Sequence, residues 1–409
     1  MKIIVAGGGA AGMMAAVTAA EAGQEVLLLE KNEKLGKKLF ITGKGRCNFT
    51  NACETSELFE HVISNPKFLY SAIYGFDNNC VMDYFASHGL PYKVERGNRV
   101  FPRSDHSSDV IKTLSEHLKR LGVKIRLNCR VLHVNVSGDR VTGVTTDQGE
   151  YSCDAVILAL GGPSYPGCGA VDDGWKIMRE LQINVTDPFP SLVPFEVAET
   201  DIPDLQGLSM KNVRLSVTVD GKTVFEEFGE LLFTHFGLSG PLILSASCYL
   251  SKADYQKKPL VSIDLKPALD EKTLDERILR DFASVQNKQF KNALSGLLPS
   301  KMIPVIIKRS EIPADKPVHE ITREERKRLL YLLKHFTCTV NGNRGLPEAI
   351  ITRGGVSVKE IDPATMAVKK YKGLYVAGEM IDVDAQTGGY NLQIAWSTGH
   401  LSGSSVGID

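Results

Sequence analysis

A glycine-rich turn near the N-terminus constrains the fold of this 409-residue chain more than any other feature. Residues 2–6 form a short apolar run, residues 7–12 read GGGAAG, and residues 10–22 have an alanine-rich helical pattern that Gly23 ends. Residues 25–30 form a second apolar run. A strand, a glycine turn, a helix and a strand in this order predict a βαβ unit, the start of a parallel α/β sheet.

The spacing of these glycines predicts a dinucleotide site. Gly7, Gly9 and Gly12 match the pattern G-x-G-x-x-G, in which glycine lets the backbone turn tightly and approach a pyrophosphate. The helix that follows adds N–H donors and the positive end of its dipole. Glu30 ends the second strand and can accept hydrogen bonds from the hydroxyls of an adenosine ribose. Because an acidic residue here disfavours a 2′-phosphate, we expect FAD or NAD rather than NADP.

Two later segments favour FAD over NAD. Residues 155–160 form an apolar strand that ends in a double glycine, and residues 373–378 form another that ends in Gly378-Glu379, with Asp382 close behind. These landmarks have the order expected of an FAD domain. No second G-x-G-x-x-G follows a strand, so we expect NADH only as a transient electron donor.

The loop at residues 41–51 reads ITGKGRCNFTN and is the most distinctive segment of the chain. Gly43 and Gly45 permit unusual backbone angles, and Lys44 and Arg46 bring positive charge towards the expected pyrophosphate. The amides of this loop, Asn48 among them, offer hydrogen bonds to the cofactor.

A second glycine turn, at residues 388–389, precedes a predicted helix over residues 391–400. Backbone N–H groups at this helix start could face the flavin pyrimidine carbonyls and stabilise the negative charge of reduced flavin. On this hypothesis, Tyr390→Ala leaves FAD bound but slows flavin reduction.

Composition excludes several classes of protein. Forty-eight basic residues balance 48 acidic ones, and a nucleic-acid binder normally carries a basic excess, so we expect no nucleic-acid partner. Eight scattered cysteines without a CxxC pair suit a reducing cytoplasm. No apolar run approaches the length of a membrane span, and the nine histidines form no HxH or HxxxH cluster, so we expect neither a membrane segment nor a metal.

The motifs together resemble a known family. They read GGGAAG, GKGRCNFTN, GNRVFP, LGGPSYP, LLFTHFGLSGP, GGV and GLYVAGEMIDVDAQTGGYNLQIAWSTG, and they span nearly the whole chain. In this respect the chain is similar to the bacterial NAD(FAD)-utilising dehydrogenase-like flavoproteins, which include aminoacetone oxidases and bile-acid ene-reductases. It departs from their usual SGGGRCN loop at Thr42 and Lys44, and from their GSTGDG loop at residues 169–174.

The expected fold is a Rossmann-like FAD-binding domain interrupted by an antiparallel β-barrel and a helical insert. Its expected parts are residues 1–190 (FAD-binding), 191–265 (barrel-like insert), 266–340 (helical insert) and 341–409 (FAD-binding). The residues expected to contact the cofactor are Gly7, Gly9, Ala11, Gly12, Glu30, Lys31, Lys38, Thr42, Gly43, Gly45, Arg46, Cys47, Asn48, Val131, Gly161, Gly162, Gly378, Glu379, Asp382, Gly389, Tyr390, Asn391 and Leu392.

The predicted activity is hydride transfer between flavin N5 and a small organic substrate. Tyr390, His235 and Arg353 are the candidate catalytic residues, because each lies in a motif-rich segment. The resemblance implies two competing activities. We favour NADH-dependent reduction of a conjugated C=C bond in a steroid- or bile-acid-like enone, and the alternative is oxidation of an aminoacetone-like amine by O2. A flavin-containing RNA-binding or RNA-modifying protein is the alternative of another class.

Overall fold

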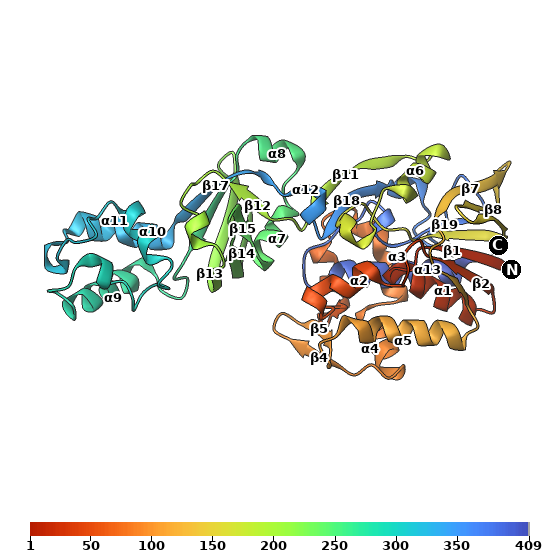
Figure 1. Ribbon diagram of the computed structural model, residues 1–409, viewed down its shortest axis with the longest axis horizontal. Helices are drawn as coiled ribbons and strands as arrows, with labels where there is room; N and C mark the ends of the chain where they lie inside the picture. The colour runs from red at the N-terminus through yellow and green to blue at the C-terminus, as the bar shows by residue number, and fades with distance from the viewer. Residues whose placement is uncertain (408–409) are drawn as a thin grey trace. The chain divides into compact units, whose positions relative to one another are not determined.

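The computed structural model describes residues 1–407 and divides the chain into two compact units (Figure 1). The discontinuous unit comprises Met1–Ser191 together with the chain from Gly345 onwards. The inserted unit comprises Leu192–Arg344. None of the helices within residues 1–407 has both the length and the apolar composition needed to cross a membrane.

A five-stranded parallel sheet forms the centre of the discontinuous unit. Its strands, in spatial order, are β19 (Leu374–Val376), β10 (Ala155–Leu158), β1 (Lys2–Ala6), β2 (Glu25–Leu29) and β6 (Lys124–Arg126). All residues of β10 and β19 are buried, as expected of strands in a parallel sheet whose two faces are both covered. The βαβ unit predicted from residues 2–30 is therefore part of a larger Rossmann-like sheet.

Two helices pack closely beside this sheet because small residues separate them. Helix α1 (Ala10–Glu21) lies against the long helix α13 (Tyr390–Ser405). A Cβ atom added at Gly399 would lie 2.4 Å from the carbonyl oxygen of Ala11, and one added at Gly403 would lie 2.5 Å from that of Ala15. The backbones of the two helices thus approach each other at positions where only glycine fits.

Smaller elements surround the central sheet. One antiparallel sheet consists, in spatial order, of β3 (Thr50–Asn51), β5 (Arg99–Pro102) and β4 (Tyr92–Glu95), and a second consists of β7 (Val131–Ser137), β8 (Arg140–Thr146) and β9 (Gly149–Ser152). A third pairs β11 (Val185–Ser191) with β18 (Ile351–Val356). The helices are α2 (Lys37–Ile41), α3 (Tyr70–Gly75), α4 (Asn78–Ser87), α5 (Ser107–Arg120), α6 (Asp173–Glu180) and α12 (Gly345–Glu348). Residues 124–136 contain two strands, β6 and β7, which belong to different sheets.

The inserted unit is a closed antiparallel barrel with attached helices. The barrel strands, in spatial order, are β12 (Phe195–Val197), β15 (Gly237–Ser239), β14 (Lys222–Phe233), β13 (Ser209–Val219), β16 (Leu260–Asp264) and β17 (Phe336–Asn343). Its helices are α7 (Pro241–Ser247), α8 (Lys252–Gln256), α9 (Glu271–Ala283), α10 (Ile303–Ser310) and α11 (Arg323–Lys334). The predicted fold class, a Rossmann-like domain interrupted by a barrel and helices, is confirmed.

The order of elements in the insert differs from a barrel followed by helices. Helices α9 to α11 lie between β16 and β17, so the last strand of the barrel comes after them in the chain. Residues 266–340 therefore contain both the helices and most of β17. Phe336 pairs with Ile263 in the barrel, although the helical period of the preceding segment extends over it in the sequence.

Candidate cofactor site

The carboxyl ends of four parallel strands bring the sequence-predicted residues to one edge of the sheet. Gly7 follows β1, Glu30 follows β2, Gly161 comes soon after β10, and Gly378 comes soon after β19. Parallel strands end on the same side, and ligands of open α/β sheets bind at that edge. Segments more than 300 residues apart in the chain thus contribute to one site.

The first glycine turn has the geometry of a pyrophosphate cradle. Gly7 has φ +107°, and a Cβ there would lie 2.3 Å from the carbonyl oxygen of Ala159. A Cβ at Gly12 would lie 1.8 Å from the carbonyl oxygen of Gly7. A Cβ at Gly9 would meet no atom within 4 Å, and Gly9 caps α1 without a side-chain hydrogen bond. Gly9 therefore leaves open space beside the N–H groups at the start of α1, which fits a pyrophosphate.

Glu30 has the burial and the acceptor capacity expected of a ribose ligand. Only 7% of this residue is exposed. Its Oε2 accepts a hydrogen bond of 2.7 Å from the Gly8 N–H, and its Oε1 accepts two from Asn32, of 2.8 Å from the backbone and 2.7 Å from Nδ2. These donors orient the carboxylate, and its remaining lone pairs can accept from hydroxyl groups.

Lys31 follows Glu30 in the sequence, and the chain just before Val131, where β7 begins, is hydrogen-bonded to Glu30. The N–H of Cys129 donates to the carbonyl oxygen of Glu30 at 2.9 Å, which brings this end of β7 to the end of β2. Burial lowers the pKa of Lys31, although its Nζ lies 3.8 Å from Oδ2 of Asp173. The predicted contacts of Lys31 and Val131 with the cofactor stay predictions.

Lys38 and Glu379, 341 residues apart, form one polar cluster. The Lys38 Nζ donates to Oε2 of Glu379 at 2.9 Å and to the Ser164 Oγ at 2.6 Å. The N–H of Thr352 donates to Oε1 of Glu379 at 2.8 Å. A Cβ at Gly162 would lie 2.7 Å from the Thr352 Oγ1. The cluster therefore joins the segments after β10 and β19 to α2.

The loop after α2 follows an unusual path that its glycines permit. Gly43, Lys44, Gly45 and Cys47 have φ of +57°, +58°, +84° and +58°. Thr42 Oγ1 donates to the carbonyl oxygen of Leu39 at 2.7 Å, at the end of α2. This left-handed path is costly for side chains other than glycine, so it marks a segment held by its surroundings.

The side chain of Arg46 lies on the β4–β5 hairpin. Its guanidinium stacks 4.2 Å from the ring centroid of Phe101 and forms ion pairs with Asp105, at 2.6 Å, and with Glu95. The positive charge of Arg46, which the sequence predicts near the pyrophosphate, is thus neutralised by two carboxylates of the protein. A cofactor contact through the Arg46 backbone stays a prediction.

Asn48 carries an unmatched polar atom in this loop. Its Oδ1 is buried and has no hydrogen-bond partner within residues 1–407. A buried acceptor without a donor costs free energy, so it indicates a donor outside the chain. The N–H and hydroxyl groups of FAD are donors of this kind, and the residues of the loop fit the cofactor. The neighbouring Cys47 thiol is fully buried, which raises its pKa to about 12.

The turn before α13 packs against the same loop. Gly388 and Gly389 have φ of +131° and +100°, and a Cβ at Gly389 would lie 2.4 Å from the carbonyl oxygen of Thr50. Tyr390 is only 7% exposed and stacks on the His61 ring at a centroid distance of 4.2 Å. This packing holds the start of α13 in place, and the catalytic role of Tyr390 stays a prediction.

Asn391 fixes the chain that leads into this turn. Its Nδ2 donates to the carbonyl oxygens of Ala385, at 2.7 Å, and Gln386, at 3.1 Å, while its Oδ1 accepts from the Ala385 N–H at 3.0 Å. These bonds occupy the side chain, so any contact of Asn391 or of the neighbouring Leu392 with the cofactor stays a prediction.

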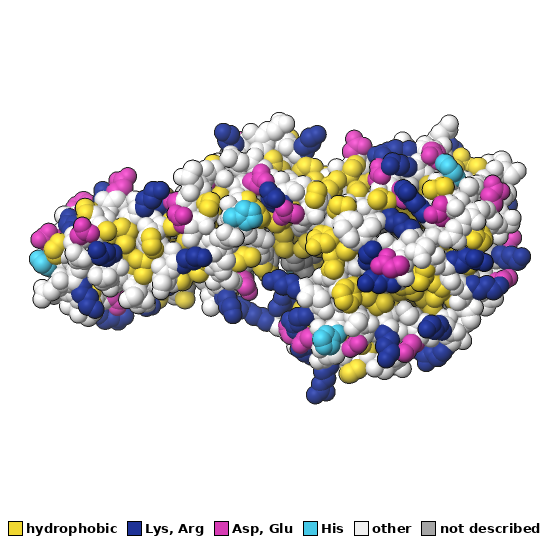
Figure 2. Space-filling model, viewed as in Figure 1, with side chains coloured by type: hydrophobic (Ala, Val, Ile, Leu, Met, Phe, Trp, Pro, Cys, Tyr) yellow, Lys and Arg dark blue, Asp and Glu magenta, His cyan; other side chains and the backbone are white. Residues whose placement is uncertain are grey.

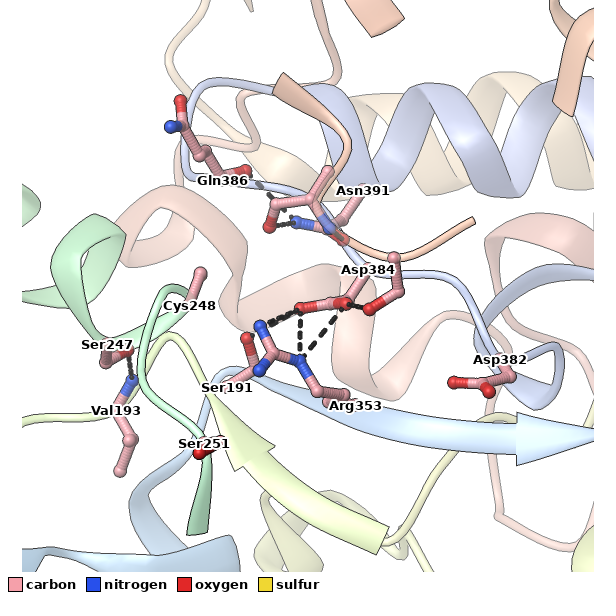
Figure 3. A network of polar contacts seen from close by, with 12 residues as sticks. Ser191, Val193, Ser247, Cys248, Ser251, Arg353, Asp382, Asp384, Gln386 and Asn391 are labelled. Carbon is pink, nitrogen blue, oxygen red and sulfur yellow. Dashed lines mark hydrogen bonds and ion pairs between the residues drawn. The ribbon is translucent and has the colours of Figure 1, made fainter. Parts of the chain in front are cut away.

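Arg353 belongs to a polar network whose other members are not among the residues predicted from the sequence. It forms an ion pair of 3.3 Å, between Nη2 and Oδ2, with Asp384, which is fully buried (Figure 3). The hydroxyls of Ser191 and Ser64 also donate to this carboxylate, the first at 3.0 Å. The only sequence signal for Asp384 is its position two residues after Asp382 in the long C-terminal motif.

Asp382 lies apart from this ion pair in Figure 3. Its Oδ2 accepts a hydrogen bond of 2.9 Å from Thr186 Oγ1. Burial raises the pKa of Asp382 above its ordinary value, and the bond from Thr186 opposes this effect. Its contact with the cofactor stays a prediction.

His235 lies in the inserted unit, in the turn between β14 and β15. The residue is exposed, and its ring stands edge-on to Phe236 at a centroid distance of 5.0 Å. Its role in acid–base chemistry stays a prediction. No group of three His, Cys, Asp or Glu residues suited to a metal ion occurs within residues 1–407.

A parallel sheet with a glycine turn after β1, an acidic residue after β2 and further glycine turns at the same edge is typical of a dinucleotide-binding Rossmann-like protein. The family described as HI0933-like protein Rossmann domain matches residues 1–405, and the chain belongs to it. The chain is thus an FAD-dependent oxidoreductase, and the predicted family, enzyme class and cofactor are confirmed.

Two relatives and one solved structure extend this comparison. The chain is 34% identical over 397 residues to the ribosomal RNA dihydrouridine synthase of Escherichia coli, covering 97% of this chain and 95% of that protein. It is 29% identical over 388 residues to the 3-dehydro-bile acid delta(4,6)-reductase of Clostridium scindens, covering 95% and 94%. The 3-ketosteroid delta1-dehydrogenase of Sterolibacterium denitrificans shares the fold, with a TM-score of 0.54 and 13% identity over 98% of both chains.

Proposed function

We propose that the protein catalyses the flavin-dependent reduction of a carbon–carbon double bond conjugated to a carbonyl group. One observation carries the proposal: two relatives that match nearly the whole chain are named for reactions of this class. Dihydrouridine is uridine whose C5=C6 bond, conjugated to the C4 carbonyl, has been reduced. The double bonds at positions 4 and 6 of a 3-dehydro steroid are conjugated to the 3-oxo group in the same way.

The chain's own residues support this chemistry. FAD, when bound, supplies the two-electron carrier that exchanges hydride with the substrate. The space beside Gly9 and the start of α1 can hold its pyrophosphate, and Glu30 can hold its ribose. The N–H groups at the start of the 16-residue helix α13 stabilise negative charge on a group that faces them. Asn48 Oδ1 offers an acceptor for an N–H group.

We infer that the substrate is uridine in ribosomal RNA rather than a steroid-like enone. The relative named for ribosomal RNA is more similar to this chain, at 34% identity, than the bile-acid reductase, at 29%. The expectation of no nucleic-acid partner rests on a net charge of zero, but a sum over the whole chain does not describe how charge is distributed. An RNA substrate also agrees with the cytoplasmic location suggested by the cysteines.

An in vitro assay tests the proposal. The purified protein, reconstituted with FAD, is incubated anaerobically with NADH or NADPH and an unmodified ribosomal RNA transcript. The RNA is then digested, and its nucleosides are analysed by mass spectrometry. We expect a uridine that has gained two hydrogen atoms, and bleaching of the flavin by one of the two nicotinamides. The same reaction with FAD-free protein is the control.

Two other substrates separate the alternatives. Reduction of a 3-oxo-4,6-diene steroid without reduction of RNA would favour the second candidate, which rests on the bile-acid reductase relative. Aminoacetone is tested in a separate aerobic reaction without nicotinamide. Hydrogen peroxide formed there, without reduction of RNA or steroid in the anaerobic assay, would indicate an amine oxidase and contradict the proposed reaction class.

A further inference from the structure

We propose that a basic surface of the discontinuous unit binds the phosphate backbone of RNA beside the cofactor site. This inference rests on the proposed RNA substrate. The basic surface is defined by Lys34, Lys44, Arg99 and Arg103, together with the exposed ring of Phe40. These residues come from the segment around α2 and from the β4–β5 hairpin with the turn that follows it.

Positive charge is concentrated in these two segments although the whole chain is neutral. Residues 31–46 contain six Lys or Arg residues and one acidic residue, and residues 93–105 contain four and two. The three acids are Glu33, which pairs with Lys37, and Glu95 and Asp105, which both pair with Arg46 and Lys93. Lys31 and Lys38 pair with acids outside the two segments, Asp173 and Glu379. The positive charge of the basic surface comes from the cations outside all these pairs, namely Lys34, Lys44, Arg99 and Arg103.

The fold joins the two segments into one surface. Arg46 connects them, because it follows the α2 loop and pairs with Glu95 and Asp105 around the hairpin. Strand β5 also pairs with β3, and the Ser107 Oγ at the start of α5 donates to the carbonyl oxygen of Phe40. Figure 2 shows Lys and Arg side chains over this part of the molecule, with hydrophobic side chains between them.

An exposed aromatic ring lies within this surface. Phe40 is 47% exposed, and Lys34 Nζ lies 5.4 Å from its ring centroid. Ile41 next to it is 36% exposed. Aromatic rings beside cations are the usual platform on which proteins stack the bases of single-stranded RNA, because every base has a π face. The combination fits RNA better than an acidic protein surface, which offers no bases to stack.

One side chain links the basic surface to the cofactor site. Asn51 Nδ2 donates to the carbonyl oxygen of Gly97, in the turn of the hairpin, and to that of Gly388, at the start of α13, both at 3.0 Å. An RNA strand on the basic surface therefore lies next to the turn that we expect to face the flavin. A base extruded from that strand needs only a short path to the cofactor.

Charge-removing variants test the surface. The test protein carries Lys34→Ala, Lys44→Ala and Arg103→Ala, all at exposed positions. The matched control carries Arg323→Ala, Lys327→Ala and Arg328→Ala, which remove the same charge from exposed positions of α11 in the inserted unit. Binding of an unmodified ribosomal RNA transcript is measured over a range of salt concentrations, and flavin absorbance with thermal unfolding confirms that both variants are folded holoenzymes.

We expect the test variant to bind RNA at least about tenfold more weakly at physiological salt, while the control binds like the wild type. The slope of log affinity against log salt should fall by roughly 2, because each lost phosphate contact releases about 0.7 fewer counterions from a single strand. Phe40→Ala should weaken binding by about fivefold or more, from lost stacking, with little change in that slope. Tyr331→Ala, which removes a ring that is 65% exposed on α11, is its control.

The possible results distinguish a failure of the proposed basic surface from a failure of the proposed function. If the wild type binds and reduces the RNA but the test variant binds equally well, the basic surface is overturned and the proposed function stands. If the wild type does not bind RNA, or binds vesicles of anionic lipid instead of RNA, both the basic surface and the proposed RNA substrate are overturned.

Discussion

The clearest test of the cofactor site is a comparison of two alanine substitutions in the same glycine turn. At Gly9 the backbone angles are φ −81° and ψ −169°, which alanine adopts readily, and a Cβ would meet no atom within 4 Å. Alanine at a helix N-cap costs several tenths of a kcal/mol, and a less flexible unfolded chain returns about as much, so Gly9→Ala should change apo-protein stability by less than about 1 kcal/mol.

The same substitution at Gly12 should act on the fold instead. Its Cβ would lie 1.8 Å from the carbonyl oxygen of Gly7, a backbone atom that cannot move without displacing the turn. Overpacking against backbone costs about 3 kcal/mol, more than the roughly 1 kcal/mol that alanine gains in helix propensity. Gly12→Ala should therefore lower the free energy of unfolding of the apo-protein by about 2 kcal/mol.

The two variants are compared by FAD titration of the apo-protein, followed by flavin fluorescence, and by urea unfolding without FAD. Because the methyl group of Gly9→Ala fills the space assigned to the pyrophosphate, we expect FAD affinity to fall at least tenfold, about 1.4 kcal/mol, with a normal unfolding curve. Wild-type affinity in Gly9→Ala would refute the placement of the pyrophosphate against Gly9.

Three further predictions concern buried groups. Arg353→Met leaves the buried Asp384 carboxylate without its ion pair and should lower the free energy of unfolding in urea by about 3 kcal/mol. Adding Asp384→Asn should recover part of this loss. An unchanged urea midpoint in Arg353→Met would show that the ion pair does not stabilise the fold. Iodoacetamide at pH 8 should label the exposed Cys80 before Cys47, whose pKa is raised to about 12 by burial, as peptide mass spectrometry can check. Burial and nearby cationic groups lower the pKa of His117 to about 4. Between pH 4 and 6.5 the unfolded state therefore binds more protons than the folded state, so the free energy of unfolding should fall by up to about 1 kcal/mol per pH unit on acidification through this range. In urea unfolding at several pH values, His117→Phe should flatten that slope.

Most of the fold can be predicted from the spacing of apolar residues and glycines over short stretches of the chain. The positions of β1, α1 and β2 follow from apolar runs and glycines within 30 consecutive residues, and such short-range patterns depend little on the rest of the chain. The sequence is less informative where an element forms only by pairing with strands that are distant in the chain. Strand β17 closes the barrel only because it pairs with β12 and β16, and its sequence next to α11 does not reveal those neighbours.

The Rossmann-like class and the FAD fingerprint follow from short motifs in the sequence, because glycine and acidic residues at set distances have one main structural use. Which side chains meet follows instead from the folding of the whole chain. It paired Lys38 with Glu379, turned Arg46 onto the hairpin and buried Asp384 against Arg353. It also joined two basic segments of a neutral chain into one surface. These outcomes depend on contacts between residues far apart in the chain, and neither composition nor periodicity records such contacts.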